Sequence, residues 1–360
     1  MVKFNKSFFV FVIFLLVQLS CGFLEEDPLT STATNSSQAD TAVFETAVPT
    51  SLAAAQQPTL ETGAIPAVVD QAALARNYLE GLIQVTGPRL PGSAEERKAA
   101  NYIEEAFEEM GYRVERQSFS FWTEAGEHLK STNLIAVKPG LSSRELVIGA
   151  HYDSGDEGDG ADDNASGVAV LLATAEQLIE VDTVYTIRFI AFGAEENDLD
   201  GSRFYVGQLE AADIHNIVYM INLDSLIAGD MAYLYGTEGG PGNLREWIGR
   251  EAYQAGFDIQ VMDASELDDE DGTPCECADY APFQDAGVNF MYFESTNWNL
   301  GDQDGMTQVA TSIGEDGVIR HTRYDTIDYI DQSFPSRIDE QLDLYVTLLV
   351  NILTRFNLAQ

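Results

Sequence analysis

The chain has 360 residues, of which 45% are hydrophobic, enough for one large α/β domain or two smaller ones with a substantial core. Its 59 Asp and Glu residues against 19 Lys and Arg give a formal net charge of −40, which argues against nucleic-acid binding and against charge-driven binding to an anionic membrane. Three cysteines are too few for a disulfide scaffold.

The N-terminus has the pattern of an export signal. Lys3 and Lys6 precede an apolar run over residues 8–17, which is too short to span a membrane comfortably. Cys21 follows this run, so residues 1–21 resemble a bacterial lipoprotein signal in which the cysteine is lipidated. Plain secretion and an uncleaved anchor are the alternatives, and all three place the protein outside the cytoplasm.

Residues 22–66 are rich in Ser, Thr, Ala and Pro and show neither a helical nor a strand period. Such a segment cannot bury enough apolar surface to offset the entropy lost on ordering. We therefore expect a disordered tether that holds a folded domain, residues 67–360, away from a membrane.

Apolar spacing predicts alternating helices and strands through this domain. A Ser93–Glu96 capping box opens the second helix. The expected helices cover residues 68–85, 93–110, 167–180, 243–255 and 335–356. The expected strands cover residues 112–122, 134–137, 145–150, 185–192, 216–223, 231–235 and 288–293. This alternation predicts a single α/β domain with a central, mostly parallel mixed β-sheet covered by helices on both faces.

Histidines and carboxylates lie at or beyond the ends of the apolar strands, where ligand sites occur in open α/β sheets. The set comprises His151, Asp162, Glu195, Glu196, Asp224 and His321. Nitrogen and oxygen ligands of this kind can hold two zinc ions, with one carboxylate bridging them and one adjacent glutamate left to act as a base.

Five segments in this order resemble motifs of the co-catalytic di-zinc peptidase family that includes bacterial leucyl aminopeptidases, glutamate carboxypeptidases and, more distantly, the transferrin receptor. The segments are GAHYDS (149–154), GADDNASG (160–167), FGAEEN (192–197), NLDS (222–225) and HTRYDT (321–326). The resemblance covers roughly residue 67 to the C-terminus and implies a zinc exopeptidase-like fold.

The resemblance also implies a role for each residue of the set. The implied ligands of two Zn²⁺ ions are His151, Asp162, Glu196, Asp224 and His321. Asp162 would bridge the ions and be followed by a cis peptide bond to Asp163. Glu195 would be the general base, and Asp153 would orient His151 through its other ring nitrogen.

The segment over residues 273–280 departs from the family pattern, in which a Cys-x-Tyr-x-Cys stretch supplies an oxyanion-binding tyrosine. Here Tyr280 is the expected donor, and Cys275 and Cys277 form either two thiols or a Cys-x-Cys disulfide. The acidic run over residues 263–271 is expected to be a solvated loop, with a calcium site or a surface for cationic peptides as the alternative.

These features predict an extracytoplasmic metallo-exopeptidase, an aminopeptidase acting on peptides with a free N-terminus. A carboxypeptidase or another amide hydrolase on the same site is one alternative, and a non-catalytic binding domain is another. Few Lys or Arg residues lie in the catalytic region, which favours binding of an ammonium group. The alternative is a site that binds a substrate carboxylate through Arg203, Arg320 or Arg323. The sequence does not indicate an oligomeric state.

Overall fold

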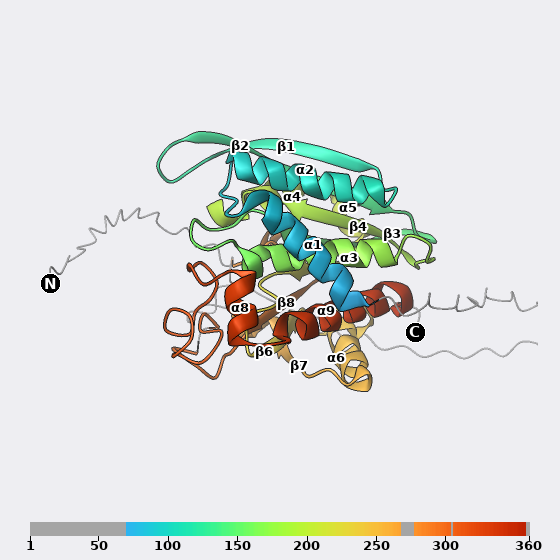
Figure 1. Ribbon diagram of the computed structural model, residues 1–360. Helices are drawn as coiled ribbons and strands as arrows, with labels where there is room; N and C mark the ends of the chain where they lie inside the picture. Colours follow the sequence, from blue (N-terminus) through green and yellow to red (C-terminus); the bar gives the residue numbers. More distant parts are fainter. Residues whose placement is uncertain (1–69, 268–276, 304, 358–360) are drawn as a thin grey trace, which may run out of the picture. The chain divides into compact units, whose positions relative to one another are not determined.

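The computed structural model describes residues 70–267, 277–303 and 305–357 (Figure 1). The predicted export signal, the tether over residues 22–66 and the lipidated Cys21 lie outside these ranges and stay predictions, as does the role of the acidic run beyond residue 267. Among the described helices, none is both long and apolar enough to cross a membrane.

An eight-stranded mixed sheet forms the centre of the described domain. Its order is β1-β2-β4-β3-β5-β8-β6-β7. The strands are β1 (Val114–Trp122), β2 (His128–Lys138), β3 (Ser142–His151), β4 (Tyr185–Phe192), β5 (Ile217–Leu223), β6 (Met231–Gly236), β7 (Ile259–Asp263) and β8 (Phe290–Thr296). Strand β3 is parallel to β4 and β5, β5 to β8, and β6 to β7, whereas β1–β2, β2–β4 and β6–β8 are antiparallel. The predicted single α/β domain with a mixed sheet is confirmed.

Strands β3, β4 and β5 lie in the middle of the sheet because apolar side chains point from both of their faces. All seven residues of β5 are buried, as is the LVIGAH half of β3. A strand of this composition needs helices on both sides. Since β4 and β5 both run parallel to β3, the three strands end at the same edge of the sheet.

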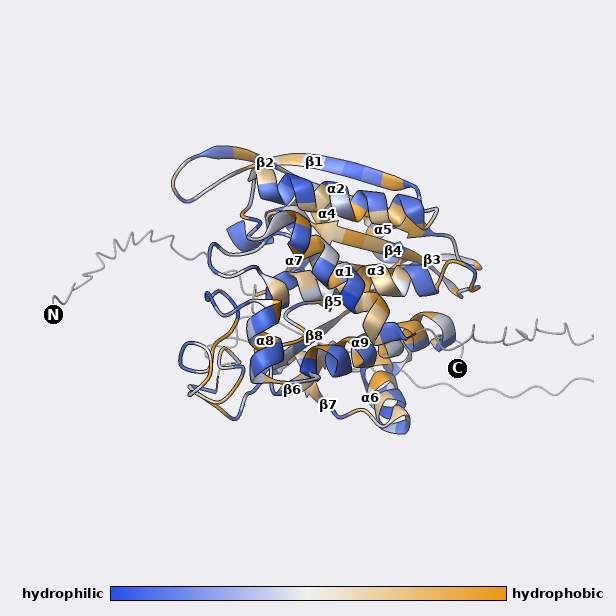
Figure 2. Ribbon diagram, viewed as in Figure 1, coloured by the Kyte–Doolittle hydropathy of each residue, from blue (hydrophilic) through white to orange (hydrophobic). Residues whose placement is uncertain are grey.

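Helices cover both faces of the sheet, as predicted. The helices are α1 (Gln71–Thr86), α2 (Ala94–Glu109), α3 (Gly167–Gln177), α4 (Asp200–Gly207), α5 (Ala211–Asn216), α6 (Leu244–Ala255), α7 (Ala281–Asp285), α8 (Ile327–Ser333) and α9 (Arg337–Arg355). Helices α1, α2, α3, α6 and α9 share one core with the sheet, and α3 lies innermost, against both α1 and α9 (Figure 1). In Figure 2 α3 is largely apolar, in keeping with this position. Helices α4, α5 and α7 cover the opposite face.

The structure differs from the expectations in short or half-exposed elements. Strand β7 was not predicted, because its residues are only partly buried at the sheet edge. Helix α9 begins at Arg337, two residues later than expected, because Ser336 has a left-handed conformation with φ 70°. The helices α4, α5, α7 and α8 are too short to give a clear helical period.

A matched pair of substitutions tests the central position of α3. Leu171 is fully buried in α3, whereas Leu141 is 69% exposed in the turn before β3. Leu171→Ala should lower the free energy of unfolding by about 2–5 kcal/mol, because it leaves a cavity in the core. Leu141→Ala should change it by less than about 0.5 kcal/mol.

Urea unfolding of both variants at one fixed metal concentration measures the difference. The metal concentration matters because bound ions stabilise the folded state. Equal changes in the two variants would contradict the position assigned to α3.

Candidate metal centre

Five segments bring polar side chains to the C-terminal edge of the central strands. His151 is the last residue of β3, and Asp224 directly follows β5. Glu195 and Glu196 lie in a short turn after β4. A turn over residues 161–166 leads into α3, and His321 lies in the loop between β8 and α8. Because β4, β3 and β5 are neighbours, their carboxyl ends meet at one place.

The side chains form two groups, each with one imidazole and two carboxylates whose ligand atoms all lie within 4.8 Å of one another. The groups are His151, Glu195 and Asp224, and Asp163, Glu196 and His321. The structure thus brings together five of the predicted site residues, with Asp163 in addition. His151, Asp163 and Asp224 are buried and the two glutamates are half-buried, whereas the His321 side chain is 54% exposed.

Asp163 lies between the two imidazoles. Its Oδ1 atom is 3.1 Å from His151 Nε2, and its Oδ2 atom is 2.9 Å from His321 Nε2. One carboxylate therefore faces both groups, each oxygen toward a different histidine. Asp224 Oδ1 is 3.5 Å from His151 Nε2, and Glu196 Oε2 is 3.2 Å from His321 Nε2.

The structure places Asp163, and not the predicted Asp162, between the two histidines. The Asp162 carboxylate is fully buried, and both of its oxygens accept hydrogen bonds from groups other than the histidines. Its Oδ1 atom accepts hydrogen bonds from the backbone N–H groups of Ile227 and Ala228 at 2.7 and 2.9 Å, and its Oδ2 atom accepts from Gln308 Nε2 at 2.6 Å. The cis peptide bond also lies one residue later than predicted, between Asp163 and Asn164.

Two residues outside the predicted set hold the loop of Asp162 and Asp163 and the loop of His321. Asp325 accepts the backbone N–H groups of Asp162 and Asp163 at 2.6 and 3.1 Å. Gln308 Oε1 accepts the N–H groups of Ile319 and Arg320, just before His321, at 3.0 and 2.8 Å. Asp325 belongs to the HTRYDT segment, so the motif contained a signal for it. Nothing local marks Gln308.

Asp153 lies beside His151, but its main contacts are with the next loop. Asp153 Oδ1 is 3.7 Å from His151 Nδ1, which is longer than a hydrogen bond. The two oxygens of Asp153 accept the backbone N–H groups of Glu195 and Glu196 at 3.1 and 3.0 Å. Asp153 therefore fixes the main chain of the glutamate pair.

The charges of the site depend on one another. Burial opposes ionisation of Asp163, but hydrogen bonds and charge from His151 and His321 hold the pKa of this carboxyl well below its usual range. Burial raises the pKa of Glu195 well above its usual value; His151 opposes this rise, and the carboxylates of Asp279 and Asp224 add to it.

The donor set fits divalent metal ions of the zinc type. Such ions bind imidazole nitrogen and carboxylate oxygen, and a bridging carboxylate needs one oxygen toward each ion. His151 with Asp224, and His321 with Glu196, provide these donors on the two sides of Asp163. Buried carboxylates held this close together repel one another, and bound cations would remove that repulsion.

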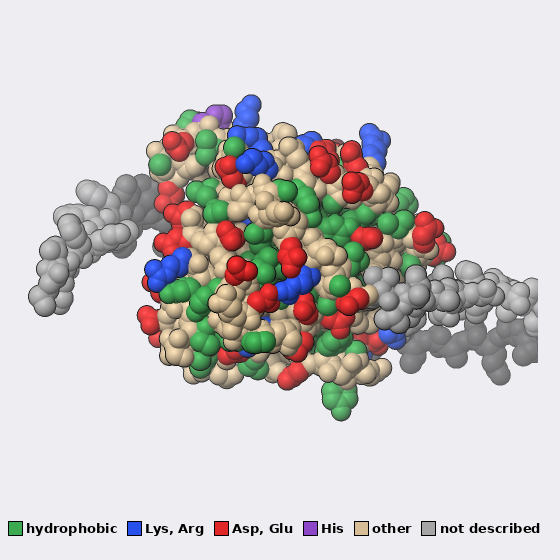
Figure 3. Space-filling view, in the orientation of Figure 1, with side chains coloured by type: hydrophobic (Ala, Val, Ile, Leu, Met, Phe, Trp, Pro, Cys, Tyr) green, Lys and Arg blue, Asp and Glu red, His purple; other side chains and the backbone are tan. Residues whose placement is uncertain are grey.

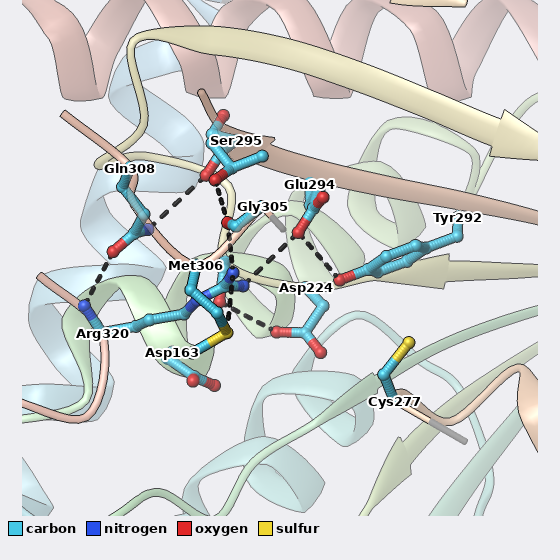
Figure 4. Close-up of polar contacts among 12 residues, drawn as sticks. Asp163, Asp224, Cys277, Tyr292, Glu294, Ser295, Gly305, Met306, Gln308 and Arg320 are labelled. Atoms are coloured by element: carbon cyan, nitrogen blue, oxygen red, sulfur yellow. Dashed lines mark hydrogen bonds and ion pairs between the residues drawn. The ribbon is translucent and has the colours of Figure 1, made fainter. Parts of the chain in front are cut away.

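A second polar cluster, built around Glu294 and Arg320, borders Asp163 and Asp224 (Figure 4). Glu294, at the end of β8, accepts hydrogen bonds from Tyr235 and Tyr292 at 2.7 and 3.2 Å. It also forms an ion pair with Arg320 at 3.4 Å. The guanidinium that directly precedes His321 is therefore already paired with a buried carboxylate.

The predicted oxyanion donor, Tyr280, is almost fully buried. Its ring stacks on Phe290 with centroids 4.1 Å apart, and its hydroxyl lies 3.4 Å from Cys277 Sγ. Cys277 is disulfide-bonded. The expected partner, Cys275, lies outside the described residues, so the predicted Cys-x-Cys pairing stays a prediction.

Comparison with known proteins identifies relatives of this chain. A family model described as Peptidase family M28 matches residues 133–346. The "Alkaline phosphatase isozyme conversion protein" of Escherichia coli K12 is 31% identical over 281 residues, which cover 70% of this chain and 81% of that protein. The "Probable lipoprotein aminopeptidase LpqL" of Mycobacterium tuberculosis is 41% identical over 113 residues, covering 31% of this chain and only 23% of that protein.

Solved structures share the fold at low sequence identity. BSAP, a zinc aminopeptidase from Bacillus subtilis, has a TM-score of 0.64 and 20% identity, covering 80% of this chain and 97% of that one. Porphyromonas gingivalis glutaminyl cyclase has a TM-score of 0.60 and 21% identity, covering 77% and 97%. Similarity at this level shows the fold and does not distinguish between these activities.

Substitution of the two adjacent aspartates tests the corrected assignment. Asp163→Asn should lower the number of metal ions retained per chain after dialysis, because the amide cannot offer an anionic oxygen to both groups. Asp162→Asn should keep the metal content. It should lower the free energy of unfolding by about 1–3 kcal/mol, because one of three buried donors loses its acceptor.

Elemental analysis by mass spectrometry and urea unfolding give the two readouts. Metal loss in Asp162→Asn with metal retained in Asp163→Asn would restore Asp162 as the bridging residue.

Proposed function

The chain belongs to peptidase family M28, and from that premise we propose that it is an extracytoplasmic aminopeptidase with two zinc ions and a glutamate general base. The single observation that carries this proposal is the position of Asp163, with one carboxylate oxygen toward each of two histidine–carboxylate groups. A site for a single ion would not need a carboxylate shared in this way.

In this proposal His151 and Asp224 hold one ion, His321 and Glu196 hold the other, and Asp163 bridges them. Bound zinc would lower the pKa of a water molecule and polarise the scissile carbonyl. The chain itself orients the donors: backbone N–H groups fixed by Asp153 and Asp325 hold Glu196 and Asp163 in place.

Glu195 is the proposed general base. Its side chain is 12% exposed, and its Oε2 atom lies 3.9 Å from His151 Nε2, farther than the Asp163 and Asp224 carboxylates. Glu195 accepts a proton from the attacking water and returns it to the leaving amine. Its partial burial supports this role, because a raised pKa brings a carboxylate closer to the pH at which it works.

The charges around the centre support a substrate with a free N-terminus. Carboxylates surround the site, and an α-ammonium group is attracted to them. The candidate carboxylate-binding arginines are engaged elsewhere: Arg320 pairs with Glu294, Arg203 with Asp198, and the exposed Arg323 donates to Tyr324. On the visible face in Figure 3, acidic side chains are spread widely.

We also propose that the mature protein is held at a membrane through a lipid on Cys21. The lipoprotein-like pattern of residues 1–21 supports this proposal, together with the name of the M. tuberculosis relative. Residues 22–66 would then set the distance between the lipid and the catalytic domain.

Mass spectrometry of digested peptides tests the function. We expect the protein to shorten free peptides from the N-terminus, to leave N-acetylated versions of the same peptides intact, and to lose activity with a chelator. The control is Glu195→Gln, which should keep both metal ions and lower kcat by about 10³-fold or more, since it removes the proton acceptor.

Shortening from the C-terminus would move the assignment to a carboxypeptidase. Absence of cleavage with metal still bound would overturn the peptidase mechanism proposed here. Full activity in Glu195→Gln would remove Glu195 from the role of base.

A separate substitution tests the proposed oxyanion donor. Tyr280→Phe should lower kcat by about 10²-fold with unchanged metal content, because it removes one hydrogen-bond donor from the transition state. An unchanged kcat would show that another group fills this role.

A further inference from the structure

The loop that carries the glutamate pair has an unusual set of hydrogen bonds. Four consecutive backbone N–H groups, those of residues 193–196, all donate hydrogen bonds to side chains from other segments. The acceptors are Asn133 Oδ1 for Gly193 at 3.2 Å, Glu96 Oε1 for Ala194 at 3.1 Å, and the two oxygens of Asp153 for Glu195 and Glu196. Side chains from other segments therefore hold the N–H groups of this stretch of main chain.

Glu96 is the member of this set that has another evident task. Ser93 Oγ accepts the N–H of Glu96 at 2.9 Å and so caps the start of α2. The reciprocal bond of the predicted capping box is not formed, because Glu96 Oε2 accepts the N–H of Gly92 at 2.7 Å and the Ser93 N–H donates to the Leu90 carbonyl. This helix start uses only one of the two carboxylate oxygens of Glu96. The second oxygen, Oε1, instead accepts the Ser131 hydroxyl and the N–H of Ala194.

From this second oxygen we infer that Glu96 is a positioning residue for Glu195, an inference that rests on the function proposed above. Glu96 is 1% exposed, so its contacts do not compete with solvent. It reaches from α2 across 98 positions in the sequence to the residue just before the proposed base. Glu96 acts on Glu195 only through the main chain and does not touch the substrate.

The conformation of Ala194 explains why this contact matters. Ala194 has φ 55° and ψ 39°, a left-handed conformation that is unfavourable for a residue with a β-carbon. This turn redirects the chain between β4 and Glu195. A hydrogen bond to the N–H of Ala194 stabilises the turn, and with it the direction in which the Glu195 side chain leaves the main chain.

Close packing at Gly193 supports the same conclusion. A β-carbon at Gly193 would lie 2.2 Å from Ser131 Oγ and 3.1 Å from Glu96 Oε1. The loop is thus seated directly on the Ser131–Glu96 pair, and removal of the carboxylate would free it to move. Misplacement of a catalytic group by about 1 Å can lower the rate by about 10²-fold.

The experiment compares Glu96→Ala with Ser93→Ala, using hydrolysis of a free peptide by the full chain. Ser93→Ala removes the side-chain cap of α2 but leaves Glu96 Oε1 on the loop. Both variants should lower the melting temperature. Glu96→Ala should also lower kcat by about 10- to 100-fold, with KM within about threefold and unchanged metal content. Ser93→Ala should keep the kcat of the wild type.

Rescue provides a readout that a purely structural role would not give. Glu96→Gln keeps one acceptor oxygen and should recover part of the lost kcat. If Glu96→Ala does not fold, Ser131→Ala decides, because it removes the hydroxyl that holds Oε1 and should lower kcat without changing KM.

The inference would be overturned if Glu96→Ala and Ser93→Ala had equal kcat. Where Glu96→Ala does not fold, it would be overturned if Ser131→Ala had the kcat of the wild type. Metal loss in Glu96→Ala would do the same. Failure of the proposed function is distinguishable, because the wild-type protein would then not cleave the peptide at all. An active wild type, a Glu195→Gln variant without activity and a fully active Glu96→Ala variant would reject the positioning role alone.

Discussion

The structure depends on holding acidic side chains together where they would otherwise repel one another. Asp163, Glu195, Glu196 and Asp224 converge on two imidazoles, and Asp162, Asp153 and Asp325 lie directly behind them. The outer carboxylates accept backbone N–H groups, which compensates part of their charge. The inner ones retain free oxygens toward the histidines. A fold that gathers carboxylates in this way suits cations and is poorly explained without them.

The central sheet explains how distant parts of the chain supply this site. Because β4, β3 and β5 are adjacent and parallel, the residues after each strand reach the same edge. The buried sides of α3 and α9 keep these strands in the interior. The loops then need only short hydrogen-bonded turns to aim their side chains. The rigid sheet, together with side chains that accept hydrogen bonds from the loop N–H groups, holds the candidate metal ligands in fixed positions.

Much of the fold could be predicted from the sequence because its long elements have clear apolar patterns: a continuous buried run in β5 and a helical period in α9. The candidate site could be predicted as a set of residues at strand ends. The choice between Asp162 and Asp163 could not, since it depends on Gln308 and on the N–H groups of Ile227 and Ala228, which lie far away in the sequence. Glu96 shows the same limit: its local pattern marks a helix cap, and only the fold brings its second oxygen to Ala194.

The central claim is that two zinc ions lie on either side of the Asp163 carboxylate. The most direct test is an anomalous difference map, recorded at the zinc absorption edge, from crystals of the zinc-loaded protein. The account predicts two peaks, one beside His151 and Asp224 and the other beside His321 and Glu196. A single peak, or peaks against Asp162 instead of Asp163, would contradict it.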